Sequence, residues 1–414
     1  MKKFIVSILA FVSALLASCA EKIHDAVFAH MGRNGMILGV NTLGAVATPL
    51  LAQGLMALRS MNVMPRLVNS DYQGAAQEKN SVINVPIPSA VTALAVSPGA
   101  VPPANQDLAP TSVPITLDQW YEAPFYITDQ EAMSVMNGYV PMQATEAVKA
   151  IANQVNAYIL GQYKGFYGFA GVAGTTPFGS DTTAASQARK LLNKQLAPTG
   201  DRRIVLDMDA EGNAITLPMF QQAQMAGSTQ TLVEGVIGRK VGFDWYADQQ
   251  VLTHNNTPLT AGAATANGVN AVGSKLVSIA KATNTSPLVK GDIISFAGSL
   301  QTYVVTADTV LAAGNTNVPI YPGLVMATAG GETVAVKASH VVNMAFHRDA
   351  IAFATRPLAE VSHPAVISVS QVDPISGISL RLEISRQHKQ TRYSFDILYG
   401  GAVIRPELGV RIGG

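Results

Sequence analysis

Two strand-like runs, each interrupted by prolines and separated by a long connection, constrain the fold most. The first run spans residues 81–88 and the second spans 113–128, where side chains from Ile115 to Tyr121 alternate at period two. Prolines in both runs suit an edge or a free-standing ribbon. The connection, residues 90–110, is longer than most loops inside compact domains. We therefore predict a projecting hairpin and, because two strands alone are marginal in water, expect it to lie on another subunit.

The apolar side chains of this ribbon are the predicted contacts between subunits. They are Ile83, Val85, Ile87, Ile115, Leu117, Trp120, Tyr121 and Phe125. Composition supports a covered surface, because charged residues make up only 13% of the 414-residue chain and hydrophobic residues 48%. The cover could be a membrane, an obligate partner or further copies of the chain. A formal net charge of +1 argues against a protein that reads nucleic acid, whereas a shell that only encloses nucleic acid needs no basic surface.

The N-terminus has the pattern of an export signal. Two lysines precede an uncharged run, residues 4–17, and Leu-Ala-Ser-Cys at residues 16–19 resembles a bacterial lipoprotein box in which Cys19 would be lipidated. The run is too short to span a bilayer comfortably. Two alternatives remain open: a helical arm buried by neighbouring subunits, or a true start at Met31 or Met36.

Helical spacing appears in two places before the middle of the chain. Residues 36–64 predict an N-terminal arm that packs on a neighbour. Residues 145–164 predict one long helix with an apolar stripe formed by Val148, Ile151, Val155 and Ile159. An α/β region follows, with predicted helices at 182–196 and 217–226, a strand at 203–209 and further strands within 236–252.

The composition changes over residues 255–339, which are rich in Ala, Thr, Gly and Asn. Short strands without helices predict an inserted β-barrel or sandwich here. The strands are expected at Leu276–Ala280, Asp292–Ala297, Thr302–Ala307, Val318–Tyr321 and Thr333–Val336. Longer strands are expected afterwards at Ile367–Val372, Ser379–Ser385 and Arg392–Tyr399.

Two motifs with catalytic or metal-binding associations lack their essential companions. Residues 207–212 resemble the start of a calcium loop, but Pro218 occupies the position of the required Glu, so a turn is favoured. Ser278 and Lys281 match the Ser-x-x-Lys pattern of acyl enzymes without its other motifs. On a strand the two side chains would face opposite sides, and we expect Lys281 to be solvated.

The seven histidines show no metal-ligand spacing. His347 with Asp349 is the nearest candidate, and we expect a structural or surface role for it. The sequence also contains no glycine-rich phosphate loop. We therefore predict a protein that is not an enzyme and that uses no metal or cofactor.

The order of these segments, together with four stretches of sequence, resembles the major capsid protein of tailed bacteriophages, which has the α+β Hong Kong 97-like fold. The similar stretches are Gly235–Asp244, Lys290–Gly298, Asn343–Leu358 and Tyr399–Leu408. The similarity is greatest to the short-tailed Salmonella phage branch, whose members carry an inserted telokin-like domain. The first 30 residues have no counterpart there, and the hairpin is apolar where the family has an acidic arm.

The resemblance implies a division of the chain into an N-terminal signal-like or arm segment (1–35), a helical N-arm (36–72), an extended β-hairpin loop (73–128), a peripheral domain with the spine helix (129–180), an axial domain (181–254), an inserted β-barrel domain (255–339) and return strands (340–414). It implies self-assembly into pentamers and hexamers of an icosahedral shell around double-stranded DNA. Scaffolding and portal proteins would be partners, and the virion capsid, assembled in the host cytoplasm, would be the location. The alternative is an exported bacterial lipoprotein or surface β-protein anchored through Cys19.

Overall fold

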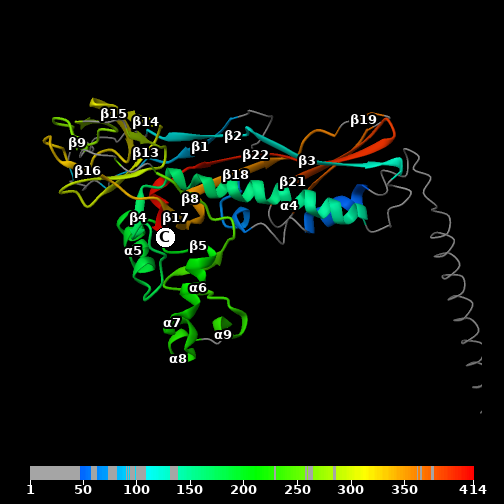
Figure 1. Ribbon diagram of the computed structural model, residues 1–414, viewed down its shortest axis with the longest axis horizontal. Helices are drawn as coiled ribbons and strands as arrows, with labels where there is room; N and C mark the ends of the chain where they lie inside the picture. Colours follow the sequence, from blue (N-terminus) through cyan, green and yellow to red (C-terminus); the bar gives the residue numbers. More distant parts are fainter. Residues whose placement is uncertain are drawn as a thin grey trace, which may run out of the picture.

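The molecule has three units. A long sheet is backed by a helix, a β-barrel lies at one end of that sheet, and an α/β unit lies below this end in the view of Figure 1. The computed structural model describes residues 47–56, 63–72, 82–89, 109–130, 139–227, 230–256 and 264–414, apart from 283–285, 361, 364–365 and 374–376, together with Val91, Ala93, Pro98 and Leu259. Cys19 and the predicted signal lie outside the described residues.

The predicted long helix is present as α4, Tyr139–Leu160, and it runs on into a 3-10 helix, η3, at Gly161–Gly165. The helix begins before the predicted Thr145. Its apolar stripe is buried as expected, with Val148, Ile151, Val155 and Ile159 each no more than 2% exposed. These side chains share one core with the sheet that α4 follows along its length (Figure 1).

That sheet is antiparallel, with strand order β18-β22-β21-β20-β19 and with β3 also paired to β22. Its strands are β3 Gln119–Thr128, β18 Ile351–Arg356, β19 Ser362–His363, β20 Val366–Val372, β21 Ser379–Gln387 and β22 Gln390–Val403. The three longer predicted strands of the C-terminal part are therefore present. β22 organises the sheet, because β3, β18 and β21 all pair with it.

The described part of the N-terminal arm packs on its own chain. Residues 47–56 are helical, and Leu50, Leu51 and Leu55 are buried in the same core as α4. Gly54 allows this close approach, since a Cβ there would lie 3.0 Å from Val148 Cγ2. The prediction that this arm packs on a neighbour is therefore wrong for residues 47–56.

The predicted hairpin ribbon is present, but its second run divides into two strands. β1, Val82–Ile87, pairs antiparallel with β2, Thr111–Thr116, whereas β3 joins the main sheet. The chain crosses over Gly400 at this division, where any Cβ would collide with the backbone of Thr116. The sequence pattern did not show this change of partner because the alternation continues across it.

The proximal half of the ribbon is covered by its own subunit, which corrects four of the predicted intersubunit contacts. Ile83, Val85, Ile115 and Leu117 are buried in one cluster with Ala352, Ala354, Leu398 and Ile404 of the main sheet region. Ile87 is partly buried against the same cluster. Alternation shows which face of a strand is apolar, and it does not show whether the same chain covers that face.

The α/β unit contains a seven-stranded mixed sheet of order β4-β23-β17-β5-β7-β6, with β8 paired to β17. Its strands are β4 Gly168–Gly171, β5 Arg202–Leu206, β6 Arg239–Lys240, β7 Phe243–Ala247, β8 Thr253–His254, β17 His340–His347 and β23 Gly409–Gly413. Its helices are α5 Thr183–Lys194, α6 Met208–Thr216, α7 Pro218–Gln221, α8 Ala223–Ala226 and α9 Gln230–Glu234.

The calcium-loop-like segment begins helix α6 instead of the predicted turn. Asp207 is the N-cap residue, and its Oδ2 accepts a hydrogen bond from the Asp209 backbone N–H at 3.2 Å. A carboxylate at this position satisfies a helical N–H that has no partner within the helix. The single helix predicted over 217–226 is instead divided into α7 and α8.

A closed barrel of order β10-β15-β13-β12-β16-β9 forms from the segment of changed composition. Its strands are β9 Ala264–Ala266, β10 Leu276–Lys281, β12 Ile293–Phe296, β13 Thr302–Val305, β15 Gly314–Tyr321 and β16 Thr333–Val336, so all five predicted strands are present. A small two-stranded sheet, β11 Ser286–Leu288 with β14 Thr309–Leu311, accompanies it.

The prediction that Lys281 is solvated is wrong. Alternation along β10 places Val277, Ile279 and Lys281 on the buried face, and Lys281 is 2% exposed with its Nζ donating to Ser286 Oγ. Ser278 lies on the other face, as expected, so the two residues of the acyl-enzyme pattern do not meet.

Candidate functional site

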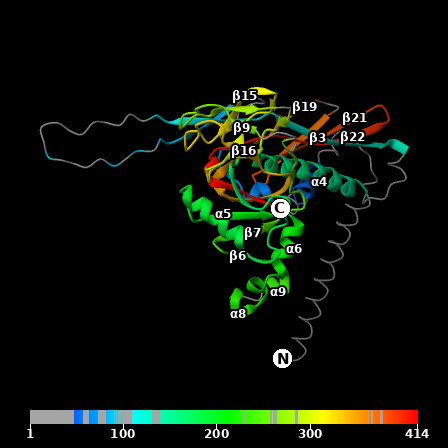
Figure 2. The same cartoon turned by 60° about the vertical axis from the view of Figure 1, so that its left-hand side comes forward.

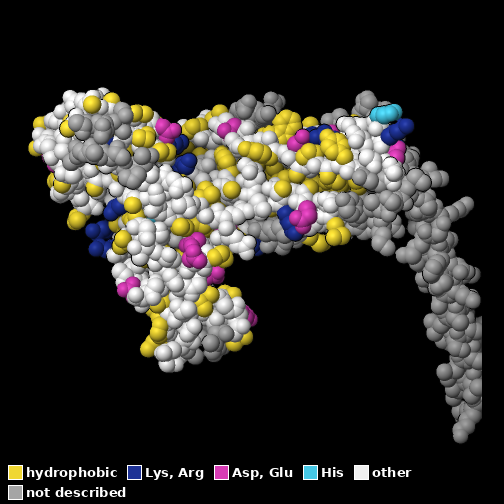
Figure 3. Space-filling model, viewed as in Figure 1, with side chains coloured by type: hydrophobic (Ala, Val, Ile, Leu, Met, Phe, Trp, Pro, Cys, Tyr) yellow, Lys and Arg dark blue, Asp and Glu magenta, His cyan; other side chains and the backbone are white. Residues whose placement is uncertain are grey.

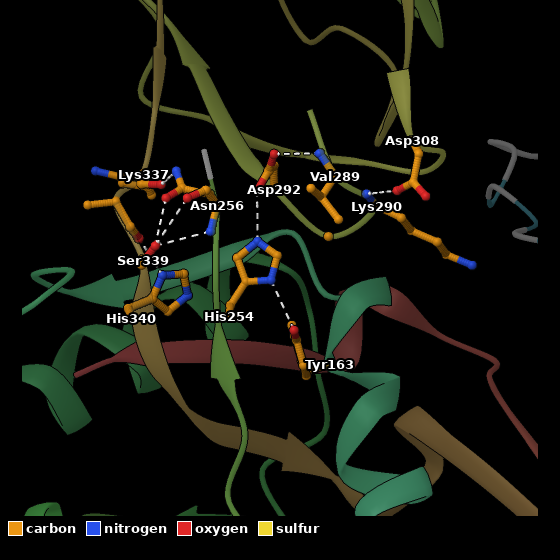
Figure 4. Close-up of polar contacts among 12 residues, drawn as sticks. Tyr163, His254, Asn256, Val289, Lys290, Asp292, Asp308, Lys337, Ser339 and His340 are labelled. Atoms are coloured by element: carbon orange, nitrogen blue, oxygen red, sulfur yellow. Dashed lines mark hydrogen bonds and ion pairs between the residues drawn. The ribbon is translucent and has the colours of Figure 1, made fainter. Parts of the chain in front are cut away.

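A buried polar cluster lies where the barrel is attached to the rest of the molecule. The chain enters the barrel after His254 of β8 and leaves it before His340 of β17, and these two histidines are directly paired in an antiparallel ladder. Their rings lie 5.6 Å apart between centroids (Figure 4). We call this cluster, formed by Tyr163, His254, Asp292, His340 and Arg411, the junction cluster.

His254 connects three segments of the chain within this cluster. Its Nε2 lies 2.8 Å from Asp292 Oδ1, and its Nδ1 lies 2.9 Å from the Tyr163 hydroxyl (Figure 4). Asp292 precedes barrel strand β12, and its Oδ2 also accepts a hydrogen bond from the Val289 backbone N–H at 2.8 Å. Tyr163 lies in η3, which follows helix α4. The contacts of one imidazole therefore join the barrel, the strand that enters it and the end of the α4–η3 helical segment.

Arg411 places a buried positive charge beside this arrangement. The residue is fully buried in β23, its Nη1 donates to the Gly291 carbonyl at 2.6 Å, and its guanidinium lies 4.9 Å from the centre of the Tyr163 ring. Burial lowers the pKa of Arg411 to about 9, while Tyr163 and Asp292 favour its charged form. Burial likewise raises the pKa of Tyr163, and Arg411 opposes that shift.

His340 lies on the apolar side of the cluster. Its Nδ1 is 2.7 Å from the Ala338 carbonyl, and its ring meets Phe169 edge to face at 5.0 Å. Burial lowers the pKa of His340 to about 4, with smaller contributions from Arg411 and His254 in the same direction. The Ala338 carbonyl and Asp292 oppose the shift.

A tyrosine, a histidine and an aspartate in hydrogen-bonded sequence resemble an acid–base relay, but their burial excludes substrate. Tyr163, His254 and Asp292 are at most 4% exposed. A catalytic base must reach a proton on a bound substrate, and the contacts of these buried side chains are all with other groups of the same chain. The junction cluster is therefore suited to fixing the barrel on the body.

No group of three His, Cys, Asp or Glu residues in the described part of the chain is placed to hold a metal ion. No helix among the described residues is long and apolar enough to cross a membrane. His347 and Asp349 do approach each other: the Asp349 backbone N–H donates to His347 Nδ1 at 3.2 Å, which caps a short 3-10 helix. Burial lowers the pKa of His347.

The remaining predicted contact residues lie on β3. Trp120 and Tyr121 are 48% and 41% exposed, which leaves them available to a partner. Trp120 Nε1 donates to Asp396 Oδ2 at 3.1 Å, so its ring is held in place. Phe125 is half-buried and stacks on Tyr393 with ring centres 5.1 Å apart, which makes it chiefly a residue of its own core.

Sequence reasoning missed the junction cluster because its members are far apart along the chain. Only one signal could have found it. His254 and His340 stand at the two ends of the segment with changed composition, and the ends of an inserted domain must lie close together in space.

Comparison with known proteins gives structural similarity only. No model of a known protein family matches the sequence, and no curated protein does. A chain from Mycobacterium phage Che8 is similar over 85% of this chain and 91% of its own, with 15% identity and a TM-score of 0.47. A chain from the capsid of the cyanophage P-SCSP1u covers 85% and 88%, with 9% identity and a TM-score of 0.48. One from a virus-like particle of Pyrococcus furiosus covers 89% and 99%, with 8% identity and a TM-score of 0.39. At these values the similarities by themselves establish neither a fold nor a function for this chain.

Proposed function

We propose that this chain is a structural, non-enzymatic subunit that assembles with copies of itself into a closed shell. The observation that carries the proposal is the distribution of exposed apolar side chains over separate parts of the molecule. They occur on the hairpin connection (Val91), on β3 (Trp120), on the α/β unit (Leu196 and Val233) and on the barrel (Leu300). A shell subunit meets several neighbours through different surfaces, and apolar side chains exposed on several units fit that role.

Within that class we propose the major capsid protein of a tailed bacteriophage, which encloses packaged double-stranded DNA. The similar sequence stretches named above support this choice. So do the spine helix along a sheet, the hairpin that leaves the body, and the barrel inserted between His254 and His340 (Figure 2). Pentamers and hexamers of this chain, a scaffolding protein and a portal protein would be its partners.

The architecture suits a subunit that must adapt to different neighbours. The spine helix and main sheet share one continuous core, which gives a rigid body. Beyond the paired strands of the ribbon, the described residues Val91, Ala93 and Pro98 are all exposed. A rigid body with an extended appendage can repeat similar contacts in fivefold and sixfold settings, and many modest contacts together hold a shell closed.

Assembly of the purified protein tests this proposal. We expect electron microscopy and sedimentation to show closed particles of uniform size at micromolar concentration, alone or with a coexpressed scaffolding protein. Trp120→Ala should lower the yield of particles while the soluble subunit keeps its circular dichroism spectrum. A wild-type chain that stays monomeric in all of these conditions would refute the shell function.

A further inference from the structure

An acidic cavity of about 360 Å³ opens on the α/β unit beside the ends of the parallel strands β5 and β7. Leu206, Ile237 and Trp245 form its apolar walls, and Glu211 of α6 and Glu234 of α9 supply two carboxyl groups. It is thus an apolar hollow bordered by negative charge, which suits a cation on an aliphatic stem.

Neither carboxyl group has an ion-pair partner among the described residues. Glu211 is half-buried, and desolvation raises its pKa, so its charged form lacks compensation in the isolated subunit. The neighbouring Val233 and Val236 are 77% and 50% exposed, which adds an apolar border. The described part of the subunit therefore supplies no cation to this cavity.

The same chain presents a surface of complementary character on helix α5. Lys190 and Lys194 are exposed on the face opposite the buried Ala188 and Leu192, and neither has an ion-pair partner within the described residues. Leu196, just beyond the helix, is 90% exposed and is held at φ 57°. A leucine in this left-handed conformation is strained, and no described contact of its side chain compensates for the strain.

The two surfaces lie on different sides of the α/β unit. Figures 1 and 2 both show α5 and α6 apart, with the sheet between them. In Figure 3 lysine and arginine gather over α5, and acidic side chains gather over the side that carries α6 and α9. Two complementary patches at different places on one molecule produce a head-to-tail contact, and repetition of that contact around an axis closes a ring.

We propose that α5 of one copy docks on the acidic cavity of the next copy, with Lys190 and Lys194 facing Glu211 and Glu234 and Leu196 against the apolar border. The inference rests on the proposed function, because it names the contact between neighbours in the rings of the shell. The carboxylates give direction to the contact, since two cavities or two α5 helices would repel each other.

Charge reversal tests the pairing. The chain Glu211→Lys/Glu234→Lys and the chain Lys190→Glu/Lys194→Glu should each need at least about tenfold more protein to assemble, because like charges then meet at the contact. A chain with all four changes should assemble again, since the pairing is restored with its sign inverted. In a mixture of the two defective chains, each chain can contact only the other kind, because one carries two positive surfaces and the other two negative surfaces. The mixture should therefore form rings with an even number of subunits and no rings of five.

Leu196→Gly provides a matched control for folding. Glycine relieves the left-handed strain, so the melting temperature of the subunit should stay the same or rise, while assembly becomes weaker. A variant that simply misfolds would lose both properties.

The outcomes also separate the two proposals. A wild-type chain that never assembles refutes the shell function itself. A wild-type chain that assembles, with charge-reversed chains that assemble equally well, refutes only the α5–cavity contact. If only the lysine changes matter and they reduce the DNA content of otherwise normal particles, α5 faces nucleic acid and the contact is likewise refuted.

Discussion

His340 shows how one residue links the stability of the molecule to pH. The residue is 2% exposed, and desolvation lowers its pKa to about 4 from an ordinary value near 6.5. At pH values between about 4 and 6.5, His340 is therefore mostly protonated in the unfolded chain and mostly neutral in the folded chain. The stability that His340 supports is complete above about pH 6.5 and is lost as the pH falls towards 4.

We predict that His340→Gln makes the free energy of unfolding depend less on pH between pH 6.5 and pH 4. In the wild type, the free energy of unfolding should fall by roughly 2–3 kcal/mol between pH 6.5 and pH 4 through this group alone. Glutamine can still donate to the Ala338 carbonyl but does not titrate. Chemical denaturation across this pH range measures the difference. His388→Gln, at an exposed position in the turn between β21 and β22, should leave the profile unchanged. Identical slopes in the wild type and His340→Gln would contradict the assignment.

At the scale of elements, helix α4 shows what a periodic pattern predicts well. Its stripe from Val148 to Ile159 was predicted from spacing alone, because a helix buries residues at intervals of 3.6. Its start was not predicted, since the residues before Thr145 carry no strong capping pattern. The ribbon shows the reverse. Its strands were predicted correctly, but the prediction that another subunit covers their apolar face was wrong for the proximal half.

The stripe leads to a prediction about stability. Ile151→Ala should lower the free energy of unfolding by about 2–5 kcal/mol, because it leaves a cavity between α4 and the main sheet. Asn153→Ala, on the exposed face of the same helix, should change it by less than about 0.5 kcal/mol. Thermal and chemical denaturation of the two variants measure the contrast. Equal effects would mean that the stripe does not carry the packing of α4.

At the scale of the whole molecule, we expect the junction cluster to stabilise the attachment of the barrel to the rest of the chain. Removing the carboxylate in Asp292→Ala leaves His254 without a partner on Nε2 and removes a negative charge beside Arg411. We expect a loss of about 1–3 kcal/mol and faster hydrogen exchange around residues 291–293 and 338–342. Exchange within barrel strands such as β10 should change little.

Asp308→Ala is the matched control for that experiment. Asp308 Oδ1 also accepts a backbone hydrogen bond in this region, from Lys290 at 2.6 Å, but the residue is exposed (Figure 4). Its loss should leave exchange at residues 338–342 unaltered. Equal exchange in both variants would show that the Asp292–His254 contact does not fasten the barrel.

The sequence by itself determined the elements with strong periodicity: helix α4, the hairpin strands and the run of short strands that closes into a barrel. These follow from local spacing of apolar residues, which needs no knowledge of distant contacts. Only the tertiary structure decided which apolar faces are covered within one chain, where β3 leaves the ribbon, and that Lys281 is buried. It also brought together Tyr163, His254, Asp292 and Arg411. Such contacts join residues far apart along the chain, and no local pattern encodes the partner that a side chain meets after folding.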